Sequence, residues 1–174
     1  TPSQSSAASD VYKRQSDDRK RKRAKCEKRK FFALTDQVIT DHLIGKSTIG
    51  IYPLLKDEKC YFLTVEFDKK NWMNDTKAFL KACDKMKISA CLERSRSGQG
   101  GHVWIFFAEA ISAVTARKLG CIILTKAMEN RHEIGFDSYD RFFPSQDTLP
   151  KGGFGNLIAL PLQSEPRKMQ NSVF

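Results

Sequence analysis

The chain has 174 residues, 40% of them hydrophobic, so it is long enough for one domain with a buried core and too short for two. Its formal net charge of +10 is unevenly placed, because residues 1–30 carry eleven Lys or Arg against four Asp or Glu, a net +7, which leaves +3 for the rest. The five cysteines form no CxxC pair, which argues against a disulfide framework or a zinc site. No apolar run reaches the length of a membrane span, so we expect a cytoplasmic protein without a membrane partner.

The first thirty residues have the composition of a polar and basic tail. Residues 1–15 are turn-rich and without hydrophobic periodicity, and they resemble a translated linker, so we set them aside as non-native. The segment 19–30, "RKRKRAKCEKRK", could bind phosphates nonspecifically or be a solvated arm. We therefore predict a disordered tail over 1–30 and one domain over 31–174. Because no helix or strand closes the final "NSVF", we also expect the natural protein to continue beyond residue 174.

The next segment, 58–68 or "EKCYFLTVEFD", alternates with the period of a β-strand. The pattern puts Tyr61, Leu63, Val65 and Phe67 on one face, and Phe62, Thr64, Glu66 and Asp68 on the other. Later elements follow from periodicity and cap residues: a helix over 76–87 capped by Asp75 or Thr76, strands over 88–94 and 102–107, a helix from Ser112, and a strand over 134–143 broken by Pro144.

This order of elements, βαββαβ, is the split βαβ arrangement of ferredoxin-like and RRM-like (RNA-recognition-type) domains, so we predict an α+β fold. Right-handed crossovers give the spatial order fourth, first, third, second, with the first strand antiparallel to both neighbours. The end of the first strand, with Glu66 and Asp68, then lies beside the beginnings of the third and fourth strands. Those beginnings hold His102 and Asp137, so four polar residues converge on one edge of the sheet.

Carboxylates two residues apart on a strand face, joined by a third from a neighbouring strand, are typical of sites for divalent hard cations. Alone, Glu66 and Asp68 could equally be a strand meeting a turn. Asp137 and Asp140 are three residues apart and face opposite ways on a regular strand, so at most one joins the site. Topology favours Asp137, whereas a β-bulge would reverse the parity and favour Asp140.

The hairpin between the second and third strands, "SGQGGH" at 97–102, offers backbone N–H groups, a hydroxyl and an imidazole. With two arginines alongside, these groups suit a triphosphate. It is not a Walker loop, because no Gly-Lys-Ser/Thr follows and the next element is a strand. An ordinary loop, with the histidine as a plain sheet residue, is the alternative. The candidate nucleotide-binding residues are Arg94, Arg96, Ser97, Gly98, Gly100, Gly101 and His102.

Four motifs in order, "VEFD", "SRSGQGGHVWIFF", "IGFDSYDRFFPSQD" and "PKGGFGNLIALPLQ", resemble the archaeo-eukaryotic primase superfamily, most closely the primase-polymerase-like domain of TOTE conflict systems of bacteria and mobile elements. The resemblance covers residues 31–174 and implies the archaeo-eukaryotic primase fold, an RRM-like core with extra N- and C-terminal elements. It implies a DNA primase or polymerase that uses two Mg²⁺ or Mn²⁺ ions to transfer nucleotides from NTPs or dNTPs to a 3′-hydroxyl. The implied partners are a single-stranded or primed nucleic acid template and helicase or nuclease domains of the same full-length protein.

Carried onto this sequence, the family's acidic first motif falls on Glu66 and Asp68, and its nucleotide-binding motif on 97–102. Its third motif fits Asp137 best and Asp140 next. The resemblance thus implies catalytic roles for these four acids and metal binding by Glu66, Asp68 and Asp137. The first motif usually begins with Asp, so Glu66 is a departure that could shift the metal spacing. Relatives also place a cysteine-rich segment before the core, of which only Cys26 remains, so we expect no metal site there.

Three other functions compete with this hypothesis. An RRM-like module would stack single-stranded bases on Trp104 and Phe106, but the hairpin sequence lacks that module's basic and aromatic pattern. A catalytically inactive primase-like domain would keep the fold and bind nucleic acid without turnover because of Glu66. A nuclease would also use clustered acids, although the triphosphate-suited hairpin argues against it. Lys151 and the "KGGFGN" segment could contact template or primer, or form a surface loop.

Overall fold

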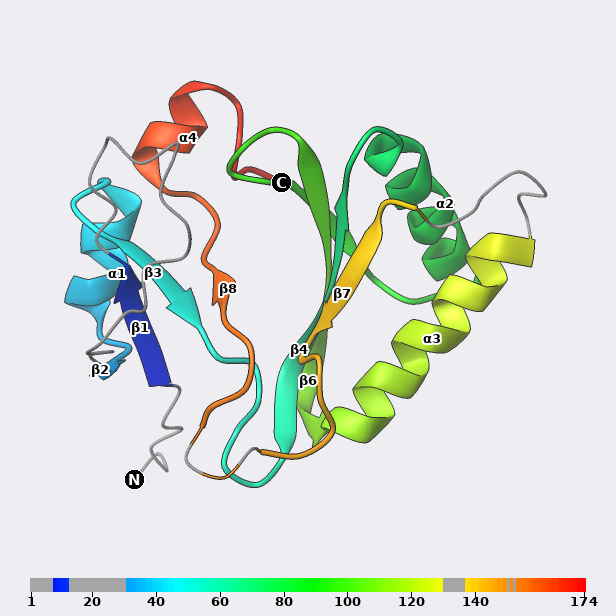
Figure 1. Cartoon of the computed structure of the whole chain (residues 1–174), viewed down its shortest axis with the longest axis horizontal. Coiled ribbons are helices and arrows are strands. Elements are labelled where there is room, and N and C mark those ends of the chain that lie inside the picture. The colour runs from blue at the N-terminus through cyan, green and yellow to red at the C-terminus, as the bar shows by residue number, and fades with distance from the viewer. Residues whose placement is uncertain (1–7, 13–30, 130–136, 150, 152) are drawn as a thin grey trace.

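The computed structural model of the chain describes residues 8–12, 31–129, 137–149, 151 and 153–174 (Figure 1). Most of the predicted tail and residues 134–136 of the predicted last strand lie outside these ranges. The described elements are β1 (Ala8–Tyr12), β2 (Phe31–Ala33), α1 (Asp36–Leu43), β3 (Thr48–Ile51), β4 (Lys59–Asp68), α2 (Trp72–Lys85), β5 (Cys91–Arg94), β6 (Gly100–Ser112), α3 (Ala113–Glu129), β7 (Tyr139–Phe143), β8 (Ile158–Ala159) and α4 (Ser164–Lys168).

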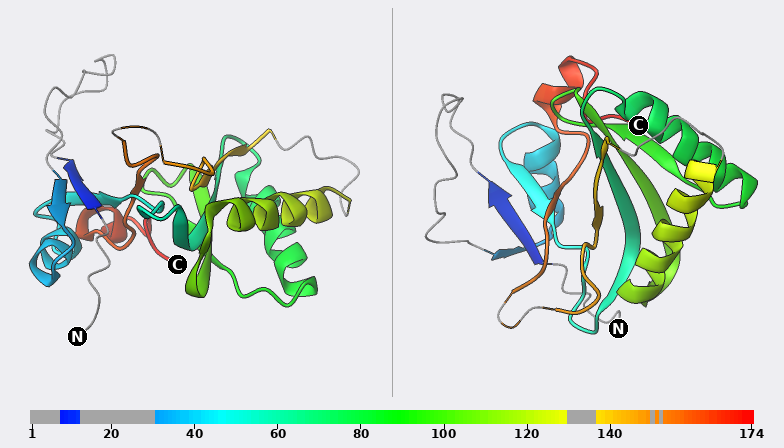
Figure 2. Two further views of the ribbon diagram at one scale, coloured as in Figure 1. Left: turned by 90° about the horizontal axis from the view of Figure 1, so that it is seen from below. Right: turned by 45° about the vertical axis from the view of Figure 1, so that its right-hand side comes forward.

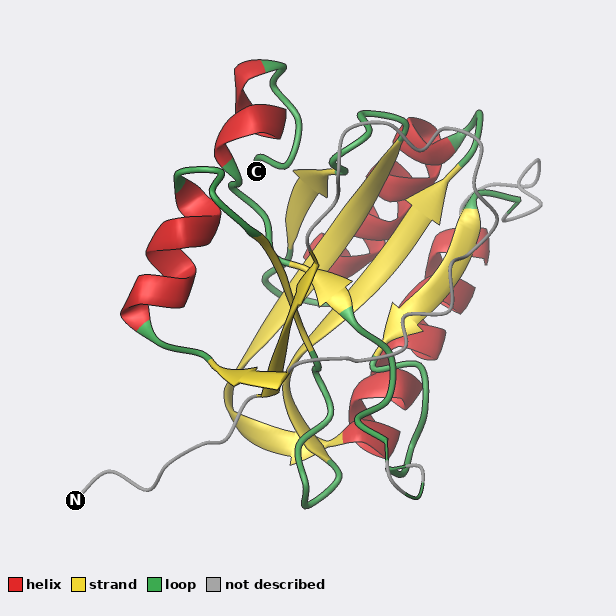
Figure 3. Ribbon diagram, turned by 60° about the vertical axis from the view of Figure 1, so that its left-hand side comes forward, coloured by secondary structure: helices red, strands yellow, loops and turns green. Residues whose placement is uncertain are grey.

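The central sheet has the strand order β5-β6-β4-β7, and all of its neighbouring strands are antiparallel. This is the predicted spatial order of fourth, first, third and second strand, so the split βαβ prediction is confirmed. In Figure 3 the strands of this sheet lie side by side, with helices behind them. The α+β fold class is confirmed as well.

Helices α2 and α3 cover one face of the central sheet (Figures 1 and 2). Leu63, Val65 and Phe67 point into this layer with Phe79 and Cys83 of α2, as part of the main hydrophobic core. The predicted alternation of β4 therefore places its apolar residues correctly over most of the strand. Tyr61 is the exception, because a register shift between Cys60 and Phe62 interrupts the pairing of β4 with β6, and Tyr61 is exposed.

The second sheet, of order β2-β1-β3-β8, lies on the other side of the central sheet (Figure 2). We call the face of the central sheet that α2 and α3 leave uncovered the helix-free face. A small cluster of Phe62, Trp104, Phe143 and Ile158 joins the two sheets. β1 pairs with both β2 and β3, so residues 8–12 form a strand inside the segment that the sequence predicted as a disordered tail. The domain boundary at residue 31 stays a prediction.

Helix α2 begins earlier than predicted. It starts at Trp72, with Asn71 before it, so the prediction of Asp75 or Thr76 as the cap is wrong. Asp75 instead lies inside the helix, buried, where it accepts a hydrogen bond from the Ser138 hydroxyl. The predicted helix at Ser112 is correct, because the Ser112 hydroxyl accepts a hydrogen bond from Thr115 N at 3.2 Å, as an N-cap does.

Three further expectations from the sequence can be compared with the structure. Among the described residues, no helix combines the length and the apolar character that crossing a bilayer requires. The described cysteines, Cys60, Cys83, Cys91 and Cys121, are free thiols. Pro144 follows the last residue of β7, as predicted.

Candidate active site

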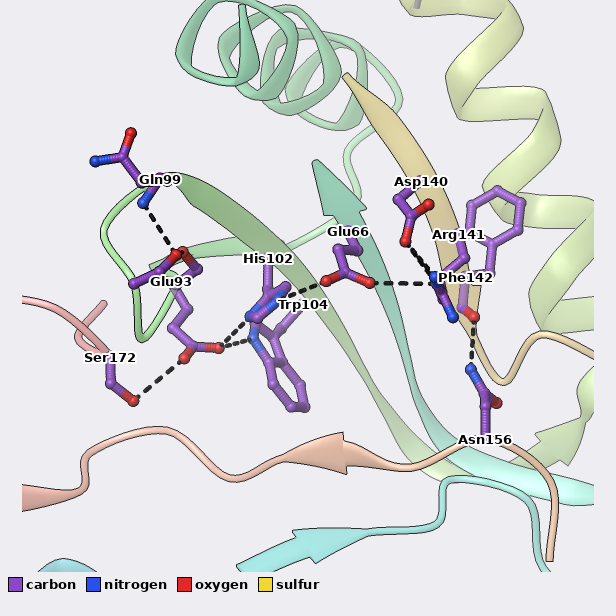
Figure 4. Close-up of polar contacts among 12 residues, drawn as sticks. Glu66, Glu93, Gln99, His102, Trp104, Asp140, Arg141, Phe142, Asn156 and Ser172 are labelled. Atoms are coloured by element: carbon purple, nitrogen blue, oxygen red, sulfur yellow. Dashed lines mark hydrogen bonds and ion pairs between the residues drawn. The ribbon is translucent and has the colours of Figure 1, made fainter. Parts of the chain in front are cut away.

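Four charged or titratable side chains form one row across the helix-free face of the central sheet. Glu93 of β5 is opposite His102 of β6, His102 is opposite Glu66 of β4, and Glu66 is opposite Arg141 of β7. Residues directly opposite each other on antiparallel strands have neighbouring side chains. The register therefore makes a row in which acid and base alternate, which we call the polar row (Figure 4).

Glu93 is the buried end of the polar row. It is only 2% exposed, and its Oε2 accepts hydrogen bonds from His102 Nδ1 at 3.0 Å and from Trp104 Nε1 at 2.9 Å. Its other oxygen, Oε1, accepts from the Ser172 hydroxyl at 3.4 Å. A buried carboxylate is tolerable when its oxygens are hydrogen-bonded in this way. Because a carboxylate only accepts, Nδ1 of His102 carries a proton and its Nε2 faces Glu66.

His102 lies between two carboxylates. Its Nε2 is 3.7 Å from Glu66 Oε1, and its Nδ1 is 3.0 Å from Glu93 Oε2. Burial opposes protonation of the ring, but hydrogen bonds and charge from Glu66 and Glu93 outweigh it and raise the pKa of His102 to about 9. The imidazole is therefore a cation at neutral pH in this structure, which suits it to an anionic ligand.

The other end of the polar row is shaped by a β-bulge in β7. Glu66 pairs with Arg141 and Phe67 pairs with Tyr139, so Asp140 is an extra residue without a partner on β4. Arg141 Nη2 lies 2.6 Å from Asp140 Oδ2, and its Nε lies 3.5 Å from Glu66 Oε2. The bulge thus brings Asp140 and Glu66 to one guanidinium (Figure 4).

The two candidates for a third acid differ in position. Asp137 precedes β7 in a turn, where it is exposed and its backbone carbonyl accepts a hydrogen bond from Lys69 Nζ at 2.9 Å. Asp140 shares Arg141 with Glu66. Topology favoured Asp137, but the bulge that the sequence left open is present, and it brings Asp140 to the guanidinium that also contacts Glu66.

Asp68 is two residues beyond Glu66 and opposite Gly100. Its Oδ1 is buried and has no hydrogen-bond partner among the described residues. A buried carboxylate oxygen without a donor is costly, and a bound cation would remove that cost. Asp68 also contributes, with Asp140 and Glu66, to the negative charge around Arg141. The pKa of Arg141 is raised mainly by the hydrogen bond to Asp140, against an opposing effect of burial, and further by these charges.

The glycines of the hairpin serve the protein's own packing. Gly98 has φ +73°, and a Cβ there would lie 2.7 Å from Asn171 Oδ1. A Cβ on Gly100 would lie 2.6 Å from the Phe67 carbonyl oxygen, and one on Gly101 would lie 2.8 Å from the Trp72 ring. These close approaches explain the glycines without a ligand. The hairpin nevertheless places Gly100 beside Asp68 and His102 beside Glu66.

The two hairpin arginines contact the protein in this structure. Arg94 Nη2 is 3.4 Å from the Gly98 carbonyl oxygen, and Arg96 Nη1 donates to the Thr48 hydroxyl at 2.9 Å. Ser97 Oγ accepts from Gln99 N at 3.2 Å and so stabilises the turn. Among the predicted nucleotide-binding residues, His102 joins a predicted acid directly, because its Nε2 faces Glu66.

The C-terminal segment closes the hairpin side of the site. Ser172 N donates to the Arg94 carbonyl, and Arg94 N donates to the Val173 carbonyl, both at 2.8 Å. In Figure 1 the C-terminus lies beside the β5–β6 turn. The segment also carries the Ser172 hydroxyl, which donates to Glu93. The residues after α4 therefore contact the polar row directly.

Sequence reasoning missed Glu93, Arg141 and Ser172. A signal for Glu93 was present, because a lone acid in the apolar strand "ISACLER" that faces His102 across a hairpin invites pairing. Arg141 follows directly after a predicted acid, but only the bulge turns it toward Glu66. Nothing local in the sequence marks Ser172, since its contact with Glu93 spans 79 residues.

Donor chemistry at the acidic end fits a hard divalent cation, because Glu66, Asp68 and Asp140 supply carboxylate oxygens and one of them lacks a partner. Over the described ranges, however, no three His, Cys, Asp or Glu side chains are already grouped as a metal site. The guanidinium of Arg141 stands between Glu66 and Asp140 instead. The acids are therefore near one another but not preassembled around a metal position.

The fold and this edge of the sheet define an α+β domain of the archaeo-eukaryotic primase type. A family model described as TOTE conflict system, Archaeo-Eukaryotic Primase domain, matches residues 4–174. The chain therefore belongs to this family, whose class of function is primase-like nucleotidyl transfer. The match includes most of the segment that we set aside as tail. A comparison with curated proteins finds no match.

Proposed function

We propose that this chain is the catalytic domain of a metal-dependent primase-polymerase, which transfers nucleotides from NTPs or dNTPs to a 3′-hydroxyl on a nucleic acid template. The observation that carries this proposal is the polar row, which places His102 beside Glu66 at the edge that also holds Asp68. Family membership gives the class of reaction. The arrangement supplies both an acidic end and a cationic imidazole within one row.

The acidic end would hold the metal ions. Glu66 and Asp68 are the two first-motif acids, Asp140 is the acid that shares Arg141 with Glu66, and Asp137 remains the alternative third ligand. Two Mg²⁺ or Mn²⁺ ions, when bound, would lower the pKa of an attacking hydroxyl and offset the charge of the leaving pyrophosphate. The carboxylates themselves neutralise and position the cations, so each should matter greatly for turnover.

The hairpin end would bind the triphosphate. Protonated His102, fixed through Nδ1 by Glu93, presents its Nε2 proton toward the acidic end, where it could donate to a phosphate oxygen. Positioning and electrostatic stabilisation account for most of the rate in phosphoryl and nucleotidyl transfer. Ser97, Gly98 and Gly100 lie in the same hairpin, and Arg94 and Arg96 would add charge after leaving their present contacts.

An RRM-like binding function is less compatible with the positions of the two aromatic residues. Trp104 is 2% exposed and donates to Glu93, so its face is not free for a base. Phe106 is 58% exposed and stacks on Trp104, with ring centroids 5.9 Å apart. A single exposed ring provides a smaller platform than the paired aromatics of such modules.

The test is Mn²⁺- or Mg²⁺-dependent incorporation of labelled nucleotides on primed and unprimed single-stranded templates. We expect incorporation by the wild type and its loss in Asp68→Ala. Asp84→Ala, which removes an exposed acid of α2, is the matched control and should keep wild-type activity. The ratio of primed to unprimed product distinguishes extension from priming.

Two results would count against the proposal. Absence of incorporation with both metals overturns it, and if metal-dependent nucleotide binding persists, the chain is an inactive primase-like domain. Incorporation that survives in Asp68→Ala would overturn the assignment of Asp68 as a metal ligand.

A further inference from the structure

Arg141 is the last residue of the polar row, on β7, and contacts two of the acids at once. Its guanidinium lies 2.6 Å from Asp140 and 3.5 Å from Glu66, and the charge of Asp68 also acts on it. Figure 4 shows Arg141 between the Glu66 and Asp140 carboxylates. The side chain is 51% exposed, so solvent is available to it and it has room to move.

Electrostatics make this position unusual. Carboxylates that gather on one edge repel each other unless a cation lies between them. In this structure that cation is a guanidinium of the chain itself. A divalent ion that takes Glu66 as a ligand would come close to Arg141, and two cations at such a distance repel. The arginine and the metal therefore compete for the same carboxylate.

The present arrangement of the acids agrees with this competition. Within the part of the chain that the structure describes, no three acidic, histidine or cysteine side chains are grouped as a metal site, although Glu66 and Asp140 both contact Arg141. Glu66 is directed between His102 and Arg141, at 3.7 Å and 3.5 Å respectively. Each of its oxygens thus faces a side-chain nitrogen of the chain itself.

We propose that Arg141 is a resident counter-ion that holds Glu66 and Asp140 in the metal-free protein and is displaced from Glu66 when a divalent cation binds. Arg141 thereby lowers the affinity of the site for metal in the absence of substrate. This inference rests on the proposed function, because it takes Glu66 as a metal ligand. It assigns to Arg141 a positioning role and no contact with the reacting atoms.

The experiment is a Mn²⁺ titration of the nucleotide-free protein, with free Mn²⁺ followed by electron paramagnetic resonance. Arg141→Gln removes the charge and should bind Mn²⁺ about tenfold more tightly, the size of a typical coupling between ligands. Arg141→Lys keeps the charge and should stay near the wild type. Arg117→Gln is the control for net charge. It removes an arginine of α3 that pairs with Asp147 and should leave the affinity unchanged.

The outcomes separate this inference from the proposed function. Saturable Mn²⁺ binding that Arg141→Gln leaves equal or weakens overturns the counter-ion role and leaves the metal-dependent function standing. Equal tightening in Arg141→Gln and Arg117→Gln also overturns it, since net charge would then be the cause. No saturable binding in any variant removes the metal site itself, and the inference with it. Thermal melts of each variant establish that the protein titrated is folded.

Discussion

Glu93 and His102 face each other across the β5–β6 hairpin, and His102 Nδ1 donates to Glu93 Oε2 at a distance of 3.0 Å. The same oxygen accepts from Trp104, which lies in the cluster between the two sheets. The orientation of the candidate nucleotide-binding histidine is therefore built into the core of the domain. Four predictions follow from this and neighbouring contacts.

Replacing the buried carboxylate should destabilise the fold. In Glu93→Ala the Trp104 and His102 donors lose their acceptor in a buried site, which we expect to cost about 2 to 3 kcal/mol of unfolding free energy. Glu93→Gln should cost less, because it keeps the shape and one acceptor oxygen. Urea denaturation measures both. The control is Glu165→Gln, which breaks an exposed pair with Lys168 and should change stability by less than about 1 kcal/mol. If Glu93→Ala lost no more unfolding free energy than Glu165→Gln, the prediction would be contradicted.

The two described histidines should titrate on opposite sides of their ordinary pKa of 6.5. Burial lowers the pKa of His42, whose Nε2 donates to the Pro161 carbonyl and whose Nδ1 accepts from Ile49 N. The pKa of His102 is raised to about 9, because its interactions with the carboxylates of Glu66 and Glu93 together outweigh burial. Proton NMR of the metal-free protein between pH 5 and 10, assigned with His42→Gln and His102→Gln, measures both.

The sign of each contribution to stability follows from linkage. The contribution of His102 to folding stability is complete below about pH 6.5 and is lost as the pH rises through about 9. The reason is that the folded protein holds the imidazole proton more tightly than the unfolded chain does, so protonation favours folding. The contribution of His42 is complete above about 6.5 and is lost as the pH falls below that value. A His102 resonance that titrates at or below 6.5 would rule out the paired imidazolium.

Gly100→Ala should destabilise the protein even without nucleotide. Its Cβ would lie 2.6 Å from the Phe67 carbonyl oxygen, so β6 must move away from β4 beside Asp68, at a cost of about 1 to 3 kcal/mol. A thermal melt without ligand measures the loss. Gln99→Ala, at an exposed neighbouring position, is the control. If Gly100 served only to admit a phosphate, the melt would not change and nucleotide affinity alone would fall.

Asn156→Ala should loosen the end of β7. The side-chain amide donates to the Phe142 carbonyl at 3.1 Å and accepts from Ser145 N at 3.0 Å, so it links the strand to the turn after it. We expect a loss of about 1 to 2 kcal/mol in unfolding free energy. Asn156→Asp keeps the acceptor and loses the donor, so it should fall between wild type and alanine in the same denaturation experiment. Wild-type stability in Asn156→Ala would show that the two bonds do not contribute.

The order of the central strands followed from the sequence because it depends on local patterns and one handedness rule. Alternation in 58–68 and helical spacing in 76–87 identify β4 and α2, and right-handed crossovers leave one strand order. That order puts Glu66 opposite the start of β6, where His102 lies. The class of fold and the meeting of these two residues were therefore predictable without a structure.

Other features needed the tertiary structure, because contacts between distant segments decide them. The bulge in β7 is set by pairing with β4, and it brings Asp140 and Glu66 to the same guanidinium of Arg141, where topology had favoured Asp137. Arg96 contacts Thr48 in the second sheet, so a side chain predicted for a triphosphate has a partner within the protein.

The sequence by itself determined the four strands of the central sheet, its two covering helices and the meeting of Glu66 with His102, since hydrophobic period and crossover hand are local or general properties. Only the tertiary structure decided how those groups are charged and held. Glu93 is buried because Trp104, His102 and Ser172 all donate to it, and these donors come from two segments far apart in the chain. Burial and ion pairing depend on such long-range packing, which no local pattern encodes.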